Sequence, residues 1–354
     1  MQNYECKTCG AVLYWNTKSN SLKCEYCDSE FDISEFEDNS KKATQEAPKV
    51  DLTYTTTGED IAEDMTVLKC DNCGAEVVTS KTTMATECAY CGQALSVSHN
   101  TAGDFRPEKI IPFKIDKKQA KETYFKYAKS SFLTPKEFQD INIIDKMQGI
   151  YVPYNLHSLD TFVDSELTCR NITSERVGND KVTTTKTYEV KVKAEGRFDS
   201  IPINASKQMD VVTMEAIEPY DFNNIKEFNP AYMAGYFAEQ PDKNHDDTTV
   251  KARQRAKDAM KEKILETADS FEDFETKTFI RYDDEFENEM HEYAMMPVWL
   301  CNVTYKNQKY TFLINGESGK IIGKLPLNKA KLAGVIGGVF AIAQIALTLF
   351  SGLL

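Results

Sequence analysis

Eight of the ten cysteines form four Cys-x-x-Cys pairs within the first 91 residues of this 354-residue chain. Fourteen residues separate the first pair from the second, and the same number separates the third from the fourth. Each pair makes a tight turn that points two thiolates at one position, and two such turns supply a tetrahedral set for Zn²⁺ with bonds of about 2.3 Å. The spacing therefore predicts two structural zinc ribbons, with the ligand sets Cys6, Cys9, Cys24, Cys27 and Cys70, Cys73, Cys88, Cys91.

The two cysteine modules repeat at an offset of 64 residues, and the repeat extends to neighbouring positions. Cys9-Gly10-Ala11 matches Cys73-Gly74-Ala75, and Tyr26-Cys27 matches Tyr90-Cys91. Four thiolates close the coordination shell, so we expect structural rather than catalytic metals. Iron–sulfur ligation and a redox dithiol remain alternatives, although the first usually shows tighter clustering and the second needs a single pair.

The charge of the N-terminal region bears on the kind of partner. Residues 1–100 contain 8 Lys, no Arg and 17 Asp plus Glu. A protein that neutralises phosphates needs the opposite balance, and only Lys7, Lys18 and Lys23 could make such contacts on the first module. We therefore expect protein partners, with nucleic-acid binding as the alternative. The N-terminal segment MQNYECKTCG lacks the features of a secretory signal, which favours a reducing compartment.

The elements that position these cysteines belong to an α+β chain. We predict a first ribbon at 1–34, a flexible polar linker at 35–66, a second ribbon at 67–100 and a mostly antiparallel body at 105–326. In the body, Asp116 and Gln119 form a capping-box pattern before a helix that ends near Ser131, and a second helix is expected over 249–267. Alternating patterns predict strands over 188–194, 299–305 and 310–314, with a turn at 306–307.

A duplicated helix-plus-sheet unit is one interpretation of the body. Tyr151-Val152-Pro153-Tyr154 and Met296-Pro297-Val298-Trp299 are similar segments, and each opens a strand after a predicted helix.

The body shows no familiar catalytic motif. Its three histidines and His99 lie outside protease or hydrolase patterns, and Gly316–Lys320 fits a β-turn better than a phosphate loop. We interpret the acidic stretch 283–292 as a hydrated loop, and Cys169 and Cys301 as core thiols. Arg253, Lys257 and Lys261 form a basic stripe on the second helix, which is either a solvated face or a docking surface. We expect no enzymatic activity and no small-molecule substrate.

The C-terminal stretch 332–354 carries no charged residue. As a helix it would be about 34 Å long, enough for a hydrocarbon core of about 30 Å. Lysines precede it, which predicts a cytoplasmic N-terminus. We therefore expect a transmembrane tail anchor and a single-pass protein of the cell membrane, with a buried C-terminal helix as the alternative.

Several motifs together resemble a known group of proteins. They are the first four cysteines, Tyr151-Val152-Pro153, Glu218–Asp221, Pro230–Tyr236, Met296–Trp299 and Asn315–Lys320. The chain resembles Gram-positive bacterial membrane proteins described as TFIIB-type zinc ribbon-containing, which are sometimes labelled primosomal helicases although no helicase ATPase motif is present here. The resemblance implies a role in membrane stress, with SPFH-type and phage-shock-type membrane proteins as partners.

These observations combine into one expectation about function. We expect a non-enzymatic, membrane-anchored zinc-ribbon adaptor that presents protein-binding surfaces at the cytoplasmic membrane face. The alternative is a membrane-tethered nucleic-acid-binding or transcription-related zinc ribbon protein.

Overall fold

The structure is a computed structural model of the whole chain. It describes residues 4, 6–11, 13–36, 65–69, 76–80, 83–87, 94–96, 107–140, 147–207, 211–239, 241, 243 and 245–351. For residues 65–96, 211–212 and 345–351 the description covers the backbone alone. Residues 37–64 of the predicted linker, and Cys70, Cys73, Cys88 and Cys91 of the predicted second ribbon, lie outside the described residues.

The strands form three sheets. A three-stranded sheet contains β1 (Leu13–Asn16), β2 (Ser21–Cys24) and β3 (Glu30–Phe31), and a two-stranded sheet contains β4 (Met65–Lys69) and β5 (Glu76–Ser80). The main sheet has ten strands: β6 (Thr83–Glu87), β7 (Ala94–Ser96), β8 (Lys109–Ile110), β9 (Gln148–Val177), β10 (Asp180–Asn204), β11 (Lys226–Glu227), β12 (Phe237–Glu239), β13 (Thr276–Tyr305), β14 (Gln308–Asn315) and β15 (Ile321–Ile322).

The helices of the described residues are distributed along the whole chain. The α-helices are α2 (Lys117–Ala128), α4 (Val211–Ile217), α5 (His245–Asp269) and α6 (Lys329–Ser351), and the short 3₁₀ helices are η1 (Ile33–Phe36), η2 (Lys136–Gln139), η3 (Phe222–Asn224) and η4 (Pro230–Met233). The capping box predicted at the start of α2 is confirmed, because Asp116 accepts a hydrogen bond from the N–H of Gln119 and the Gln119 side chain accepts one in return.

Two long antiparallel strands form the centre of the main sheet. β9 and β13 pair from Gln148 opposite Leu300 to Arg170 opposite Thr276. Each continues into a hairpin, β9 with β10 and β13 with β14. The turn predicted at Lys306–Asn307 is confirmed, and both residues adopt positive φ angles. The body is therefore mostly antiparallel, as predicted.

The main sheet contains two units with the same order of elements. The first is β8–α2–β9–β10 and the second is β12–α5–β13–β14. Their short leading strands are exchanged, because β8 pairs in parallel with β13 and β12 pairs in parallel with β9. β12 lies opposite Ile150 and Tyr151, whereas β8 lies opposite Ala294 and Met295, so corresponding positions of the two units differ by 144 residues.

Hydrogen bonds repeat at the same offset. The N–H of Ala205 donates to the carbonyl of Pro153 at 2.9 Å, and the N–H of Gly316 donates to the carbonyl of Pro297 at 2.9 Å. Asn204 and Asn315 each accept a hydrogen bond through Oδ1 from the N–H two residues on. The similar segments around Pro153 and Pro297 thus occupy corresponding positions and pair with one another across the sheet centre.

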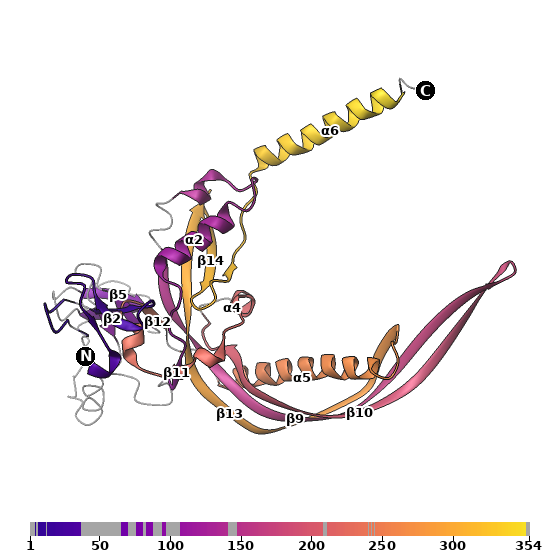
Figure 1. Cartoon of the computed structure of the whole chain (residues 1–354), viewed down its shortest axis with the longest axis horizontal. Coiled ribbons are helices and arrows are strands. Elements are labelled where there is room, and N and C mark those ends of the chain that lie inside the picture. The colour runs from indigo at the N-terminus through magenta and orange to yellow at the C-terminus, as the bar shows by residue number, and fades with distance from the viewer. Residues whose placement is uncertain are drawn as a thin grey trace.

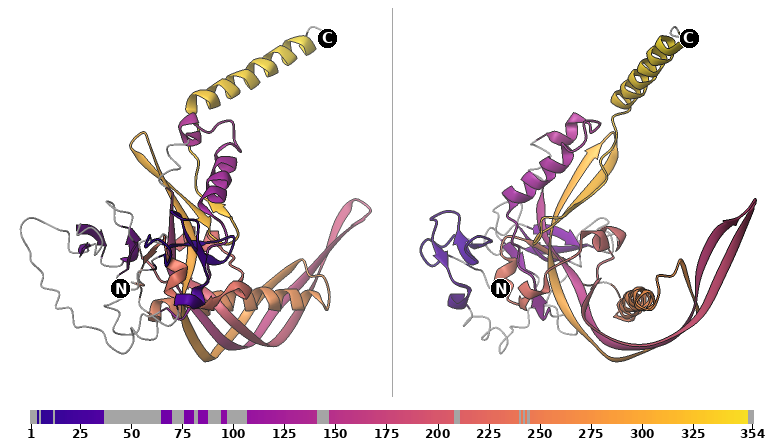
Figure 2. Two further views of the ribbon diagram at one scale, coloured as in Figure 1. Left: turned by 60° about the vertical axis from the view of Figure 1, so that its left-hand side comes forward. Right: turned by 45° about the vertical axis from the view of Figure 1, so that its right-hand side comes forward.

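Helix α5 lies in the concave face of the long curved strands (Figure 2, right). It buries one residue on nearly every turn, at Thr248, Ala252, Ala256, Met260, Ile264 and Ala268. This spacing of four is narrower than the predicted face, and Ala259, which we expected to be buried, is exposed. The basic stripe of the helix turns toward β13, where Arg253 pairs with Glu289 and Lys257 pairs with Asp284.

The acidic stretch 283–292 forms part of strand β13 rather than a hydrated loop, so that prediction was wrong. Its carboxylates find partners on neighbouring strands and on α5, which is why an acid-rich sequence can be extended here. Cys169 and Cys301 are fully buried, as expected of core thiols. Gly316–Lys320 forms a turn closed by the N–H of Gly319 and the carbonyl of Asn315 at 2.9 Å.

The predicted transmembrane helix over 332–354 is corrected by the structure. Helix α6 extends away from the sheet (Figure 1), but it begins with Lys329 and Lys331, and its apolar run with described side chains ends at Gln344. Crossing a bilayer takes about 20 consecutive apolar residues. Within the part of the chain that the structure describes, no helix combines the length and apolarity that a membrane span requires. The transmembrane element of the predicted fold class and the single-pass membrane localisation are therefore withdrawn.

Candidate metal centre

The first Cys₄ module folds around two matching turns. After Cys6 the chain returns so that the N–H of Gly10 donates to the carbonyl of Cys6 at 2.8 Å, and after Cys24 the N–H of Asp28 donates to the carbonyl of Cys24 at 2.9 Å. Gly10 has φ 76° and Asp28 has φ 57°. Glycine adopts this left-handed conformation freely, and aspartate is one of the few other residues that tolerate it.

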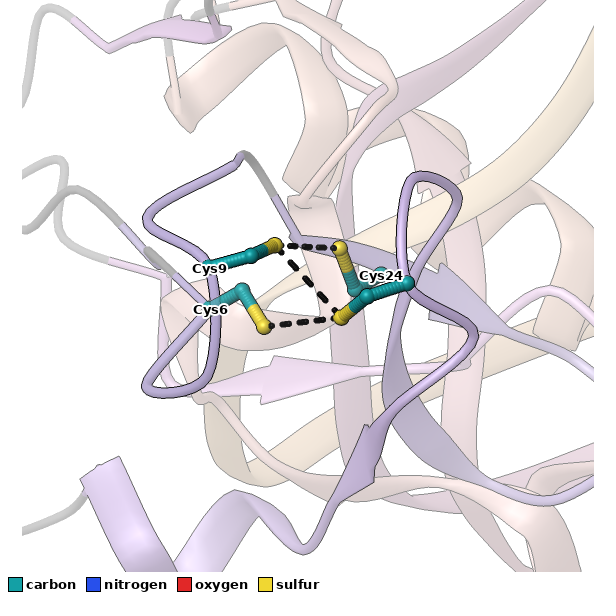
Figure 3. A group of neighbouring side chains, drawn as sticks. Cys6, Cys9 and Cys24 are labelled. Atoms are coloured by element: carbon teal, nitrogen blue, oxygen red, sulfur yellow. Dashed lines mark hydrogen bonds between the residues drawn. The ribbon is translucent and has the colours of Figure 1, made fainter.

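The four thiols of Cys6, Cys9, Cys24 and Cys27 converge on one position (Figure 3). Neighbouring Sγ atoms are 3.4–3.5 Å apart, and all four lie within 4.8 Å of one another. A tetrahedral ion with metal–sulfur bonds of about 2.3 Å requires sulfur–sulfur distances of about 3.8 Å. The arrangement therefore fits a metal ion closely, and the set can hold one with no coordination position left over.

The environment of the thiols favours metal binding. Cys6 and Cys24 are buried, while Cys9 is exposed and Cys27 is half-buried. Hydrogen bonds with the side chain and then the backbone of Ser29 lower the pKa of the Cys27 thiol to about 6. Because thiolates are the form that binds metal, this ligand loses its proton readily at neutral pH.

The ribbon is docked on the body rather than free. The ring of Trp15 on β1 packs edge-to-face on Tyr232 of η4 with centroids 4.7 Å apart, and the N–H of Trp15 donates to the carbonyl of Ala234 at 3.2 Å. Gly235 allows this approach, because a Cβ there would lie 2.3 Å from the ring of Tyr14. Ribbon and body share one apolar cluster as a result.

A hollow of about 460 Å³ lies at the junction between ribbon and body. Its lining is mostly polar and comes from both sides: Asn20, Asp32, Ile33, Ser34, Lys226, Glu227, Phe228, Asn229 and Tyr232.

The three lysines that could contact nucleic acid are paired with carboxylates. Lys7 lies 3.1 Å from Glu35, Lys23 lies 3.1 Å from Asp28, and Lys18 reaches across to Asp116 on the body at 3.2 Å. Each positive charge is thus opposed locally, and the ribbon gains no basic surface in three dimensions.

The face of the ribbon away from the body displays an aromatic side chain. Tyr26 stands between the ligands Cys24 and Cys27 and is 84% exposed. The sequence repeat places a tyrosine at the same point of the second module, where Tyr90 precedes Cys91.

The second set of cysteines falls in the connections between paired strands. Cys70 and Cys73 come between β4 and β5, and Cys88 and Cys91 come between β6 and β7. These strands pair as hairpins, and β6 also joins the main sheet by pairing with β12. The four cysteines themselves lie outside the described residues.

Sequence reasoning found the four ligands of the first site but missed its docking surface. Trp15, Tyr232 and Gly235 are far apart in the chain, and no local pattern links them. An isolated tryptophan in a small ribbon was the single available signal, since so large an apolar side chain needs more cover than such a module supplies.

Comparisons with known proteins give one curated relative and no family. The chain is 28% identical to the uncharacterized protein YdjG of Bacillus subtilis (strain 168) over 359 residues, which covers 99% of this chain and 98% of that protein. No family model matches the chain. No solved structure matches it either.

Proposed function

We propose that this chain is a non-enzymatic zinc-ribbon adaptor that binds a protein partner through the exposed side of its first ribbon. The observation that carries the proposal is the position of Tyr26, which is 84% exposed on a turn held by two buried or half-buried thiols. Tyrosine is among the residues that dominate protein–protein binding energy. A metal-stiffened turn would present it with little loss of conformational entropy on binding.

Zinc is the metal that fits the proposal best. Four thiolates in a closed tetrahedral set are typical of structural Zn²⁺, whose role is to hold a small fold together. By the sequence repeat, Cys70, Cys73, Cys88 and Cys91 would hold a second zinc ion. Elemental analysis of the purified chain should give two zinc ions per chain, and Cys6→Ser with Cys9→Ser should reduce the number to one.

The partner class comes from the family resemblance of the sequence. It points to SPFH-type proteins of the membrane-stress response, with phage-shock-type proteins as a further candidate. The proposal is that the ribbon face around Tyr26 docks on such a protein while the opposite face stays bound to the body.

The test compares Tyr26→Ala with Phe271→Ala in binding to the purified SPFH-type protein of the same organism. Phe271 is 74% exposed and lies on the body, so it controls for loss of any exposed aromatic ring. We expect Tyr26→Ala to weaken binding at least about 30-fold, as a hot-spot residue would. Equal affinities for the two variants would reject the proposed surface, and no binding by the wild-type chain would reject this partner class.

A further inference from the structure

Three of the four histidines of the chain meet at one point of the main sheet. His157 on β9 and His291 on β13 are directly opposite in the antiparallel register, and His245 begins helix α5 above them. The ring of His245 lies 3.8 Å from that of His291 and 5.6 Å from that of His157, centroid to centroid. The third separation, between His157 and His291, is 6.2 Å.

The innermost histidine has an unsatisfied polar atom. His157 is 4% exposed, and its Nε2 has no hydrogen-bond partner among the described residues. Leaving a buried polar atom without a partner costs about 1–3 kcal/mol, so its persistence calls for a ligand. Burial and the two neighbouring imidazoles lower the pKa of His157 to about 4, which keeps the ring in the neutral form that binds metals.

The backbone is shaped around this cluster. The registers of β10 and β13 both shift beside β9 at this level, between Phe198 and Ile201 and between Glu287 and Met290. Each shift contains a residue other than glycine at positive φ, namely Ser200 and Asn288. β-Bulges of this kind change the direction of nearby side chains and are common beside functional sites.

The internal repeat supplies a built-in comparison. At the offset of 144 residues, His157 corresponds to Cys301 and His291 corresponds to Met147, and both of these are buried in an apolar cluster. The fold is therefore satisfied by apolar side chains at these two positions. The histidines are a departure that belongs to one half of the sheet.

The ring separations are close to those of imidazoles sharing one ion. With metal–nitrogen bonds of about 2.0–2.1 Å and tetrahedral angles, ring centroids should be about 5.2 Å apart. The observed separations of 3.8, 5.6 and 6.2 Å lie on either side of this value. Unlike the four thiols, the three imidazoles do not yet converge, but His245 and His291 are exposed and free of packing constraints on rotation.

We propose that His157, His245 and His291 bind a divalent transition-metal ion of the imidazole-preferring class, such as Zn²⁺, Co²⁺ or Ni²⁺, after a small rotation of the two exposed rings. Three protein ligands leave one coordination position open, unlike the closed Cys₄ set. Glu289 stands beside the cluster in a two-point ion pair with Arg253, at 2.6 and 2.9 Å, and adds negative charge near the ion. The site is independent of the proposed adaptor function.

The test uses the zinc-loaded, tag-free full-length chain dialysed against Co²⁺ alone. We expect one Co²⁺ per chain beyond unchanged zinc, with the visible bands of nitrogen-ligated cobalt and no thiolate charge-transfer band. His157→Asn, His291→Asn and His245→Ala should each weaken Co²⁺ binding at least about tenfold. His99→Asn, which changes the remaining histidine of the sequence, should bind Co²⁺ like the wild type.

Three results would overturn the proposal. They are the absence of additional Co²⁺ at millimolar concentration, Co²⁺ binding that gives only the thiolate band, and an affinity that His245→Ala leaves unchanged. The last variant keeps the test decisive even if His157→Asn fails to fold, because His245 is exposed.

Discussion

Replacing each of the two tryptophans with phenylalanine should give unequal losses of stability. Trp15 and Trp299 are equally buried, each 4% exposed. They differ in the indole N–H: that of Trp299 donates to the carbonyl of Ile115 at 2.9 Å, whereas that of Trp15 has no partner among the described residues. The change to phenylalanine removes similar apolar area at both sites, so the hydrogen bond should decide the difference.

The magnitude follows from the two environments. Trp299→Phe leaves the buried carbonyl of Ile115 without its donor, which costs about 1–3 kcal/mol in addition to the lost ring area. Trp15→Phe removes a buried donor that is already unpaired, so relief of that penalty offsets most of the lost area. We expect Trp299→Phe to lower the free energy of unfolding by about 1–3 kcal/mol more than Trp15→Phe does.

The assay is equilibrium urea unfolding of the metal-loaded chain followed by far-ultraviolet circular dichroism. Trp15→Ala serves as the reference for complete loss of the ring, at a cost of about 3–5 kcal/mol in the apolar cluster shared by ribbon and body. Equal losses for the two phenylalanine variants, or a Trp15→Phe loss as large as that of Trp15→Ala, would refute the reasoning.

Three further predictions concern the ribbon and its dock. Cys24→Ser should abolish metal binding at the first site and shift Trp15 emission to longer wavelength, while circular dichroism of the body stays unchanged; unshifted emission would show that docking does not need the metal. Gly235→Ala, at φ 82° and with an aromatic ring 2.3 Å from the added Cβ, should lose more stability than Gly178→Ala, at φ 68° with no atom within 4 Å; equal melting temperatures would contradict the close contact. Although burial opposes it, the Gln119 N–H and the Lys18 charge lower the pKa of Asp116, so its stabilisation is present above the usual carboxyl pKa and is lost as pH falls through the lowered value. The cost of Asp116→Ala, about 1 kcal/mol at pH 6, should therefore shrink toward pH 3 in urea titrations, and a pH-independent cost would argue against a charged cap.

Local patterns predicted the elements whose cause is local. The spacing of Cys6, Cys9, Cys24 and Cys27 identified a site whose thiols converge, and the Asp116–Gln119 pair marked the start of α2. The alternation before and after residues 306–307 gave the β13–β14 hairpin because its two strands adjoin in sequence. In each case the determining contacts join residues close together in the chain.

Contacts between distant segments could not be read in this way. His157 and His291 meet only because β9 pairs with β13, and nothing in either local sequence fixes that register. Ala259 was placed on the buried face of α5 because periodicity gives a helix face but not the width of the surface that covers it. The acidic residues 283–292 suggested a loop, since the partners that allow them in a strand lie on α5 and β9.

The C-terminal segment shows a different limit. Composition alone predicted a membrane span for 332–354, whereas the described part of α6 does not reach the length and apolarity required. Counting apolar residues says nothing of which of them a folded chain presents as one continuous helix surface.

The exchange of leading strands between the two halves of the main sheet constrains the order of events during synthesis. The β9–β10 hairpin is local and can close as soon as it leaves the ribosome, but the other edge of β9 waits for β12 and β13. Its partner positions on β13 are supplied by residues 276–300. Until these residues emerge, a strand of 30 residues offers an unpaired edge to other chains, so cotranslational chaperone protection should matter most within this interval.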